Sequence, residues 1–425
     1  MTTIKIPYGG RSLQFNLPDR CLGTVLSPQS VRSRHNAGDI ISKALAQPVG
    51  TRPLKQMVSP GGTVAVIIDD ISRCTPTHRM LPLLLGELHD AGIEEKNIRI
   101  VIALGTHRPM TPDEILAKTG PRIVDRYRIV NLSSQETDQQ VYVGTSSNGI
   151  PAWVNRTVAE ADFRIGVGMI TPHMDVGYSG GAKIILPGVC GQRTVDAFHC
   201  RQAALYGNQL GLVDAPMRQD FERFVAERIG LDFILNAIVD QGGDLFDCVA
   251  GDCIMAHRKG VTVARQVFGV PVEKRFSIVI SNSYPADRDL WQSVKGLASG
   301  ELMTRDGGTL ILVSHCPEGT RTHPHYADYI GRDLDQLLAQ LARGTIEDPV
   351  ACALAVPICR IRQRVKVALV SAHLSHSDAD RMGFPWYSDV EGALADALDG
   401  HCDKTVAVLT HGGISLPLVR SGGLE

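Results

Sequence analysis

Residues 64–70 read VAVIIDD, a continuous apolar run that ends in two acids. Residues 77–91 follow with apolar side chains three or four positions apart, as on one face of a helix. Strands of a parallel sheet are buried on both faces, so they read as unbroken apolar runs and alternate with helices. This pair of segments therefore predicts an α/β fold.

The same alternation continues along the chain. We expect further strands at residues 98–104, 163–170, 276–282, 309–314, 365–371 and 405–410, and helices at residues 333–342 and 388–398. A helix start is predicted where Thr111, Pro112 and Glu114 have the spacing of a capping box with proline at the first helical position. Residues 1–20 predict a hairpin, since apolar positions alternate on both sides of Gly9 and Gly10.

A mild linker signal near residues 265–275 divides these elements into two groups. We expect two α/β domains with mostly parallel sheets and an active-site cleft between them. Residues 1–270 would form the N-terminal cofactor-binding and catalytic domain. Residues 271–425 would form the C-terminal domain that closes the cleft.

Composition excludes several classes of protein. The chain has 425 residues, 44% of them hydrophobic, 21% charged, and a formal net charge of −2, which favours neither nucleic acid nor an anionic membrane. No apolar run approaches the ~20 residues of a membrane helix, and the start does not read as a signal peptide, so we expect a cytoplasmic protein. Ten cysteines without a C-x2-C pair argue against a zinc ribbon or a thioredoxin-like site.

Polar clusters follow the predicted strands, and in open parallel sheets ligands bind beyond the carboxyl ends of the strands. The six clusters lie at residues 69–73, 105–108, 171–173, 314–315, 371–373 and 410–413. Five of the six carry a histidine, in a chain with only 14 histidines. His107 and His173 are the candidate proton-handling pair, because imidazole titrates near physiological pH. The alternative is that each ring only binds the backbone of its own loop.

The glycine-rich segment GYSGGAKIILPG at residues 177–188 is the sharpest local signal. Glycines let backbone N–H groups approach an anion, and Lys183 adds a positive charge, which indicates phosphate binding. Ala182 and Ile184 break the P-loop pattern, so magnesium-dependent triphosphate hydrolysis is disfavoured. Lys183 precedes an apolar run and is also a candidate for a lowered pKa and covalent chemistry. The alternative is a turn with a solvated lysine.

Two further positions are weak signals on their own. His199 falls in a predicted helix, and one imidazole can bind nickel, zinc or copper but does not make a site by itself. Gln292 and Lys295 are spaced to share one face of a helix, where Lys295 suits a carboxylate or phosphate and Gln292 a hydroxyl or carbonyl. An ordinary exposed helix end is the alternative for this second pair.

Taken together, these motifs resemble the lactate racemase family, whose founding member uses a nickel-pincer nucleotide. The matching stretches are DDISR at 69–73, GTHRPMT at 105–111, PH at 172–173, SGGAK at 179–183, His199, Gln292 and Lys295. Their order and spacing match over almost the whole chain. The resemblance implies a racemase or epimerase, an isomerase that inverts C2 of a 2-hydroxy acid by hydride transfer to and from this cofactor.

The resemblance also implies roles for individual residues. Lys183 would be joined by a thioamide to the cofactor, a pyridinium-3-thioamide-5-thiocarboxylic acid mononucleotide with nickel. His199 would be the protein ligand to nickel, with two sulfurs and a ring carbon of the cofactor in the other positions. His107 and His173 would be the acid and base on opposite faces of the substrate, with a planar keto acid between them.

The remaining matched residues, Asp70, Arg73, Gln292 and Lys295, would bind cofactor or substrate, with Arg73 or Lys295 pairing the carboxylate. Implied partners are a small 2-hydroxy acid and the enzymes that make the cofactor. Cys74 stands where the family often has proline, a change of packing. Trp291 stands where the lactate enzyme has tyrosine, which places it at the substrate and favours a larger or more polar acid, such as a sugar acid.

Two other functions stay open from the sequence. A hydroxy-acid dehydratase or lyase would use the same two histidines without returning the hydride. A non-catalytic carrier of nickel or cofactor would keep Lys183 and His199. A carrier needs no acid–base pair, so the presence of both His107 and His173 argues against it.

Overall fold

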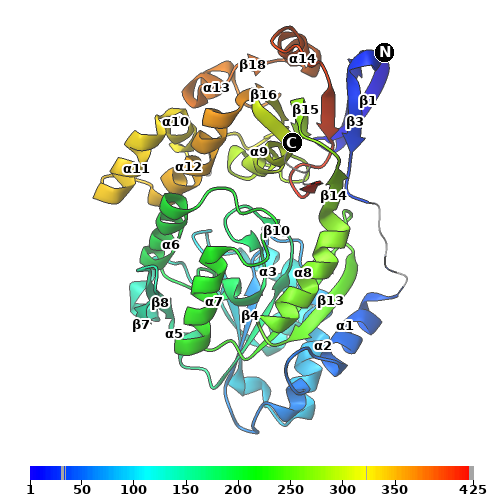
Figure 1. Cartoon of the computed structure of the whole chain (residues 1–425). Coiled ribbons are helices and arrows are strands. Elements are labelled where there is room, and N and C mark those ends of the chain that lie inside the picture. The colour runs from blue at the N-terminus through cyan, green and yellow to red at the C-terminus, as the bar shows by residue number, and fades with distance from the viewer. Residues whose placement is uncertain (30–32, 34, 322, 421–425) are drawn as a thin grey trace. The chain divides into compact units, whose positions relative to one another are not determined.

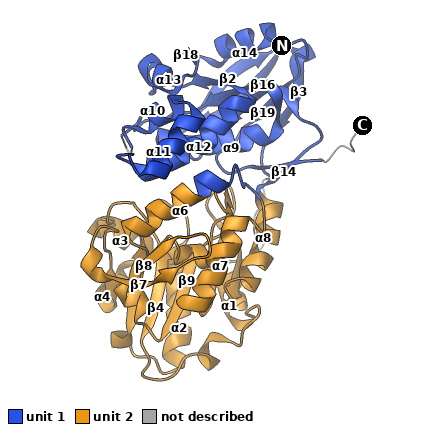
Figure 2. Ribbon diagram, turned by 60° about the vertical axis from the view of Figure 1, so that its left-hand side comes forward, with its two compact units in different colours: residues 1–29, 202–211, 268–425 blue, residues 30–201, 212–267 orange. Residues whose placement is uncertain are grey.

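The computed structural model describes residues 1–29, 33, 35–321 and 323–420 and divides the chain into two compact units (Figures 1 and 2). Unit 1 comprises Met1–Gln29, Gln202–Gly211 and Phe268–Glu425. Unit 2 comprises Ser30–Arg201 and Leu212–Val267. Within the described residues, no helix combines the length and the apolar character needed to span a membrane.

Unit 2 is built on a six-stranded sheet in the order β13-β12-β9-β4-β5-β6. The strands are β4 (Val64–Asp69), β5 (Ile98–Ala103), β6 (Arg128–Val130), β9 (Phe163–Met169), β12 (Phe233–Val239) and β13 (Leu245–Gly251). Neighbouring strands are parallel except β12 and β13, which are antiparallel. The carboxyl ends of β4, β5 and β9 therefore lie side by side at one edge, as the sequence predicts.

The helices of unit 2 surround this sheet. They are α1 (Ala37–Ala46), α2 (Thr77–Asp90), α3 (Pro112–Thr119), α4 (Pro121–Arg126), α5 (Arg156–Ala159), α6 (Gln192–Leu205), α7 (Pro216–Arg228) and α8 (Met255–Phe268), of which α6 and α8 continue into unit 1. Two short hairpins pair β7 (Gln140–Thr145) with β8 (Pro151–Asn155) and β10 (Pro172–His173) with β11 (Gly177–Tyr178).

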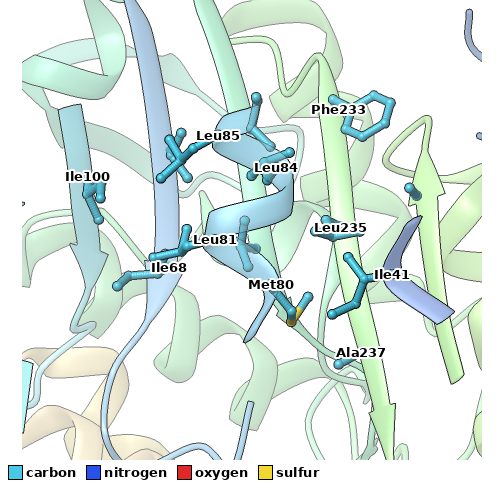
Figure 3. Close-up of a cluster of buried hydrophobic side chains, with 14 of the residues drawn as sticks. Ile41, Ile68, Met80, Leu81, Leu84, Leu85, Ile100, Phe233, Leu235 and Ala237 are labelled. Carbon is cyan, nitrogen blue, oxygen red and sulfur yellow. The ribbon is translucent and has the colours of Figure 1, made fainter. Parts of the chain in front are cut away.

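The apolar residues predicted for the first strand and helix form the core of this unit. Ile68 of β4 and Leu81 and Leu84 of α2 are fully buried in one cluster with Ile100 and Leu235 from neighbouring strands (Figure 3). Burial of a leucine or isoleucine side chain stabilises a fold by roughly 1.5–3 kcal/mol. This cluster therefore holds helix α2 against the sheet and fixes where β4 ends.

The loop between β5 and α3 is held in place at its C-terminal end. The predicted capping box is confirmed: the Thr111 hydroxyl accepts from the Glu114 backbone N–H at 3.3 Å, and the Glu114 carboxylate accepts from Thr111 N–H at 2.8 Å. Asn131 bonds both the N–H and the carbonyl of Met110, at 3.0 and 2.7 Å. Residues 104–110 are thus a short, anchored loop between two fixed elements.

Unit 1 contains a second six-stranded sheet, in the order β18-β17-β16-β15-β19-β3, with every pair of neighbours parallel. Its strands are β3 (Leu22–Leu26), β15 (Phe276–Asn282), β16 (Thr304–Val313), β17 (Lys366–Val370), β18 (Trp386–Tyr387) and β19 (Val406–Leu409). Its helices are α9 (Leu290–Met303), α10 (Tyr326–Gly331), α11 (Leu334–Arg343), α12 (Pro349–Arg364), α13 (His376–Met382) and α14 (Val390–Asp399). A separate parallel pair joins β14 (Gly269–Val272) to β20 (Leu416–Val419).

The division of the chain differs from the two continuous domains, 1–270 and 271–425, expected from the sequence. The hairpin of β1 (Thr2–Tyr8) and β2 (Arg11–Leu17) forms as predicted. Its buried residues Ile6 and Phe15 share one apolar cluster with Ile278 and Val408, and β3 pairs with β19. Residues 1–29 therefore group with the C-terminal part of the chain, because their apolar face is buried there.

Candidate active site

The nine residues singled out from the sequence fall into two sets. Unit 2 holds Asp70, Arg73, His107, His173, Lys183 and His199. Unit 1 holds Trp291, Gln292 and Lys295, all on α9. In unit 2, Asp70 and the other listed residues up to Lys183 follow the carboxyl ends of β4, β5 and β9. His199 lies on α6.

Asp70 and His107 form a direct pair. His107 Nδ1 donates to Asp70 Oδ2 at 2.6 Å, and the Ser72 hydroxyl donates to Asp70 Oδ1 at 2.6 Å. Burial alone would raise the pKa of the Asp70 carboxyl, but the hydrogen bond and charge of His107, with smaller effects of Ser72 and Arg73, lower it. The carboxylate stays ionised and directs His107 Nδ1 toward itself, which leaves Nε2 as the proton-accepting nitrogen.

Asp69, the residue before Asp70 in the sequence, has a structural role. Asp69 Oδ1 pairs with Lys118 Nζ at 2.7 Å, and Asp69 Oδ2 accepts from the Thr75 hydroxyl. Lys118 also donates to the Arg73 carbonyl at 2.8 Å. Asp69 thus fastens the loop of residues 70–76 to α3, so that only the second of the two acids faces a site histidine.

His173 and His199 share one neighbour, Asp175. The Asp175 backbone N–H donates to His173 Nδ1 at 3.2 Å. The Asp175 carboxylate oxygen Oδ2 lies 3.9 Å from Nδ1 of His173 and 3.9 Å from Nδ1 of His199. Asp175 is only 3% exposed. Sequence reasoning missed this residue, because an aspartate two positions after a histidine is not in itself a signal.

The glycines of the segment 177–188 are required by close packing. A Cβ on Gly180, whose φ is +78°, would lie 2.7 Å from Asn236 Oδ1 and 3.0 Å from the Met169 carbonyl. The Gly181 N–H donates to the same Asn236 oxygen at 2.8 Å. Gly166 of β9 leaves room for Ile184, whose Cγ2 would lie 2.9 Å from a Cβ there. The short helix η5 (Gly181–Ile184), which carries Lys183, is therefore pressed onto the sheet.

Two buried basic side chains hold the backbone before Lys183, and neither was predicted from the sequence. Arg218 of α7 is fully buried and donates to the carbonyls of Val176, at 3.1 Å, and Tyr178, while pairing with Glu222 at 2.9 Å. His257 of α8 donates Nε2–H to the Ser179 carbonyl at 2.8 Å. In the sequence Arg218 belongs to a polar helix and would be read as solvent-exposed.

Lys183 lies near the charged side chains of Arg73, Arg218 and Asp175. Burial lowers the pKa of its ammonium, the positive charges of Arg73 and Arg218 lower it further, and the Asp175 carboxylate raises it, which leaves the pKa at about 7. A lysine with such a pKa is partly neutral at physiological pH and can act as a nucleophile toward an electrophilic carbon.

These residues fit the cofactor implied by the family resemblance. A thioamide link requires a neutral amine, and Lys183 supplies one. Within the described ranges, no group of three histidine, cysteine, aspartate or glutamate side chains is arranged to hold a metal ion. A metal bound here would need donor atoms from a cofactor beside the imidazole of His199, which suits a nickel ion that its organic ligand largely surrounds.

The three residues of unit 1 are also ordered. Lys295 Nζ donates to Gln292 Oε1 at 2.6 Å, so the two side chains share one face of α9, as their spacing predicts. The Trp291 ring stacks on His323 at a centroid distance of 3.9 Å and meets Tyr326 edge-on at 5.0 Å. His323 in turn pairs with Asp348 at 2.6 Å. Trp291 is therefore held in one orientation by two aromatic neighbours.

Other strand-end histidines of unit 1 make local contacts. His373 Nδ1 bonds the His315 carbonyl at 2.9 Å, and the two rings pack edge to face at 4.5 Å. His411 packs edge to face against Tyr284 at 5.3 Å. These three histidines therefore make packing and hydrogen-bonding contacts within the loops at the end of the sheet.

Comparison with known proteins places the chain in a family. Residues 8–210 match the model of the lactate racemase N-terminal domain, and residues 272–417 match that of the C-terminal domain. Lactate racemase from Thermoanaerobacterium thermosaccharolyticum is 32% identical over 324 residues, which cover 75% of this chain and 76% of that protein. The enzyme of the same name from Lactiplantibacillus plantarum is 29% identical over 327 residues, with the same two coverages.

A solved structure agrees with the sequence relatives. The lactate racemase apoprotein from T. thermosaccharolyticum superimposes with a TM-score of 0.88 at 30% identity, over 99% of this chain and 100% of that one. The mixed α/β architecture with mostly parallel sheets, predicted from the sequence, is thus confirmed and shared with a relative. The chain belongs to the lactate racemase family and is an isomerase.

Proposed function

We propose that this protein racemises or epimerises a 2-hydroxy acid at C2, with a nickel-pincer nucleotide covalently bound to Lys183. The observation that carries the proposal is the group of side chains at one edge of the sheet in unit 2. His107 follows β5 and His173 follows β9, the two strands that flank β4. Lys183, whose pKa is about 7, also follows β9, in the short helix η5. The lactate racemase family needs a nickel cofactor, and the relatives named above point to a hydroxy acid as the substrate.

Lys183 and His199 would hold the cofactor. The neutral amine of Lys183 would form the covalent link, and His199 would bind nickel through a ring nitrogen. When bound, the cofactor would supply a hydride acceptor and donor for C2. Loading depends on the enzymes that make the cofactor, so we propose that they are partners of this protein in the cytoplasm.

His107 and His173 would handle the hydroxyl proton. Inversion through a planar keto acid requires one base to take that proton and one acid to return a proton to the same oxygen after the hydride comes back on the other face. His107 begins as the base, because its Nδ1–H is held by Asp70 and its Nε2 is available. The Asp70 carboxylate then stabilises the imidazolium that forms. For the opposite enantiomer the two histidines exchange roles.

The remaining residues would bind and select the substrate. Arg73 or Lys295 pairs the substrate carboxylate, and Gln292 accepts or donates a hydrogen bond to a hydroxyl or carbonyl. Trp291, which packs against His323 and Tyr326, would contact the substrate side chain, as the family resemblance implies. Because this ring replaces the tyrosine of the lactate enzyme, we propose a 2-hydroxy acid larger or more polar than lactate, such as a sugar acid.

Reactivity against pH tests the state of Lys183 in protein made without the cofactor. A lowered pKa leaves the amine neutral above about pH 7, so carbamylation of Lys183 by cyanate should be half-maximal near that pH. The exposed Lys96 is the control, and the pH profiles of the two lysines should differ. Peptide mass spectrometry across a pH series measures both. Parallel profiles for the two lysines would contradict the lowered pKa.

Intact mass and nickel content test the cofactor in protein co-expressed with the cofactor-making enzymes. We expect a nucleotide-sized added mass and bound nickel, both lost in Lys183→Ala and both retained in Lys43→Ala, a change of an exposed lysine of α1. His199→Ala should keep the added mass but lose the nickel. Protein made without those enzymes should be inactive. A folded wild-type protein with neither adduct nor nickel would rule the cofactor out.

Kinetics of the loaded enzyme test the two histidines. His107→Ala and His173→Ala should each lower kcat by about 10²–10⁴-fold, the usual contribution of a positioned acid or base, with adduct and nickel unchanged. His376→Ala, on an exposed residue of unit 1, is the control and should retain full activity. Chiral analysis of the product should show the inverted hydroxy acid. An unsaturated or keto product would indicate the dehydratase or lyase instead.

A panel of 2-hydroxy acids tests the substrate and the role of Trp291. We expect a higher kcat/KM for at least one acid larger than lactate, and a change of about tenfold or more in its ratio to lactate in Trp291→Tyr, since one pocket contact typically contributes ~1–3 kcal/mol to discrimination. Trp386→Tyr, at the half-buried Trp386 in β18, is the control. If lactate is the best substrate and Trp291→Tyr leaves the ratio unchanged, the substrate proposal is wrong.

A further inference from the structure

Asp175 is a buried carboxylate that no part of the proposed reaction uses. It lies in the tight connection between β10 and β11 and is 3% exposed. A carboxylate is costly to bury unless nearby charges or hydrogen bonds compensate it. Its position beside several functional candidates therefore calls for an explanation in terms of those neighbours.

Asp175 acts on two histidines, through its backbone N–H and through its carboxylate. Its backbone N–H donates to His173 Nδ1 at 3.2 Å, a contact that any residue at this position could make. Its side-chain Oδ2 lies 3.9 Å from His199 Nδ1 and 3.9 Å from His173 Nδ1, which is within range of a charge interaction but longer than a hydrogen bond. The carboxylate also acts electrostatically on Lys183, together with Arg73 and Arg218.

The carboxylate decides which nitrogen of His199 can bind a metal. A negative charge facing Nδ1 favours the tautomer with the proton on that nitrogen, which leaves the Nε2 lone pair for the metal. Metal-binding histidines in proteins almost always direct their second ring nitrogen to a carboxylate, a carbonyl or water, and loss of that partner typically lowers metal affinity 10–100-fold. His199 Nδ1 faces the Asp175 carboxylate at 3.9 Å, a longer-range version of this arrangement that acts through charge.

We propose that the Asp175 carboxylate is a positioning residue that orients His199 so that its Nε2 faces the nickel of the cofactor. This inference rests on the proposed function and adds a residue to it. Substitution of the side chain keeps the backbone N–H that bonds His173 Nδ1 but removes the charge that faces both rings. Nickel retention, rather than activity, therefore reports the effect on His199.

Nickel retention by the loaded holoenzyme tests this inference with Asp175→Ala and Asp175→Asn. The control is Asp220→Asn, which also alters a buried aspartate of unit 2, one whose carboxylate accepts from the Ser146 hydroxyl at 2.8 Å. Intact mass reports the link to Lys183, metal analysis after timed exposure to EDTA reports the loss of nickel, and the absorption spectrum reports the nickel environment.

We expect all four proteins to carry the added mass. Asp175→Ala should lose nickel 10–100-fold faster than wild type, with a shifted spectrum, and Asp175→Asn should be intermediate because its amide oxygen keeps a partial negative charge facing Nδ1. Asp220→Asn should match wild type. If Asp175→Ala does not fold, the isosteric Asp175→Asn decides the question, provided that its melting temperature equals that of wild type.

Two outcomes would overturn the inference, and they differ from each other. Wild-type nickel retention in the folded Asp175 variants, with the added mass present, would remove Asp175 from the nickel site while leaving the proposed function intact. Absence of both added mass and nickel from the wild-type protein would overturn the proposed function, and the role of Asp175 with it.

Discussion

The packing of η5 on strand β9 is the constraint on which the rest of the site depends. Gly166 has no side chain, so Ile184 lies against the strand, and Asn236 of the next strand accepts from Gly181 N–H. Gly180 approaches Met169 and Asn236 so closely that a Cβ there would overlap both. Lys183 is consequently held at the sheet edge. In a flexible turn its amine would be in water.

Once Lys183 is placed there, the charges around it determine its chemistry. Burial and the positive charges of Arg73 and Arg218 favour the neutral amine, and Asp175 opposes them. Arg218 also holds two carbonyls of the connection that leads to η5, and Glu222 compensates its buried charge. The same side chains thus maintain the geometry of the segment and the reactivity of the lysine, which explains why charged residues are buried at this edge.

Much of the fold could be predicted from the sequence because its signals are local. Apolar runs and helical spacing located β4 and α2, and the capping box at Thr111 located the start of α3. Candidate site residues could also be predicted, since parallel strands bring their carboxyl ends together. What they do remains a proposal. Composition and spacing did not distinguish the two acids at the end of β4, and only the family resemblance singled out Asp70. The ion pair with Lys118 shows that Asp69 is structural.

The sequence by itself determined the succession of strands and helices, the cap of α3, and the family motifs that mark Lys183, His199 and the two histidines, because each of these depends on residues near one another in the chain. Only the tertiary structure decided that residues 1–29 join the C-terminal sheet and that Asp175 and Arg218 stand around Lys183. Those features depend on contacts between apolar surfaces and charged groups that are far apart in the sequence, and three-dimensional packing determines which of these contacts form.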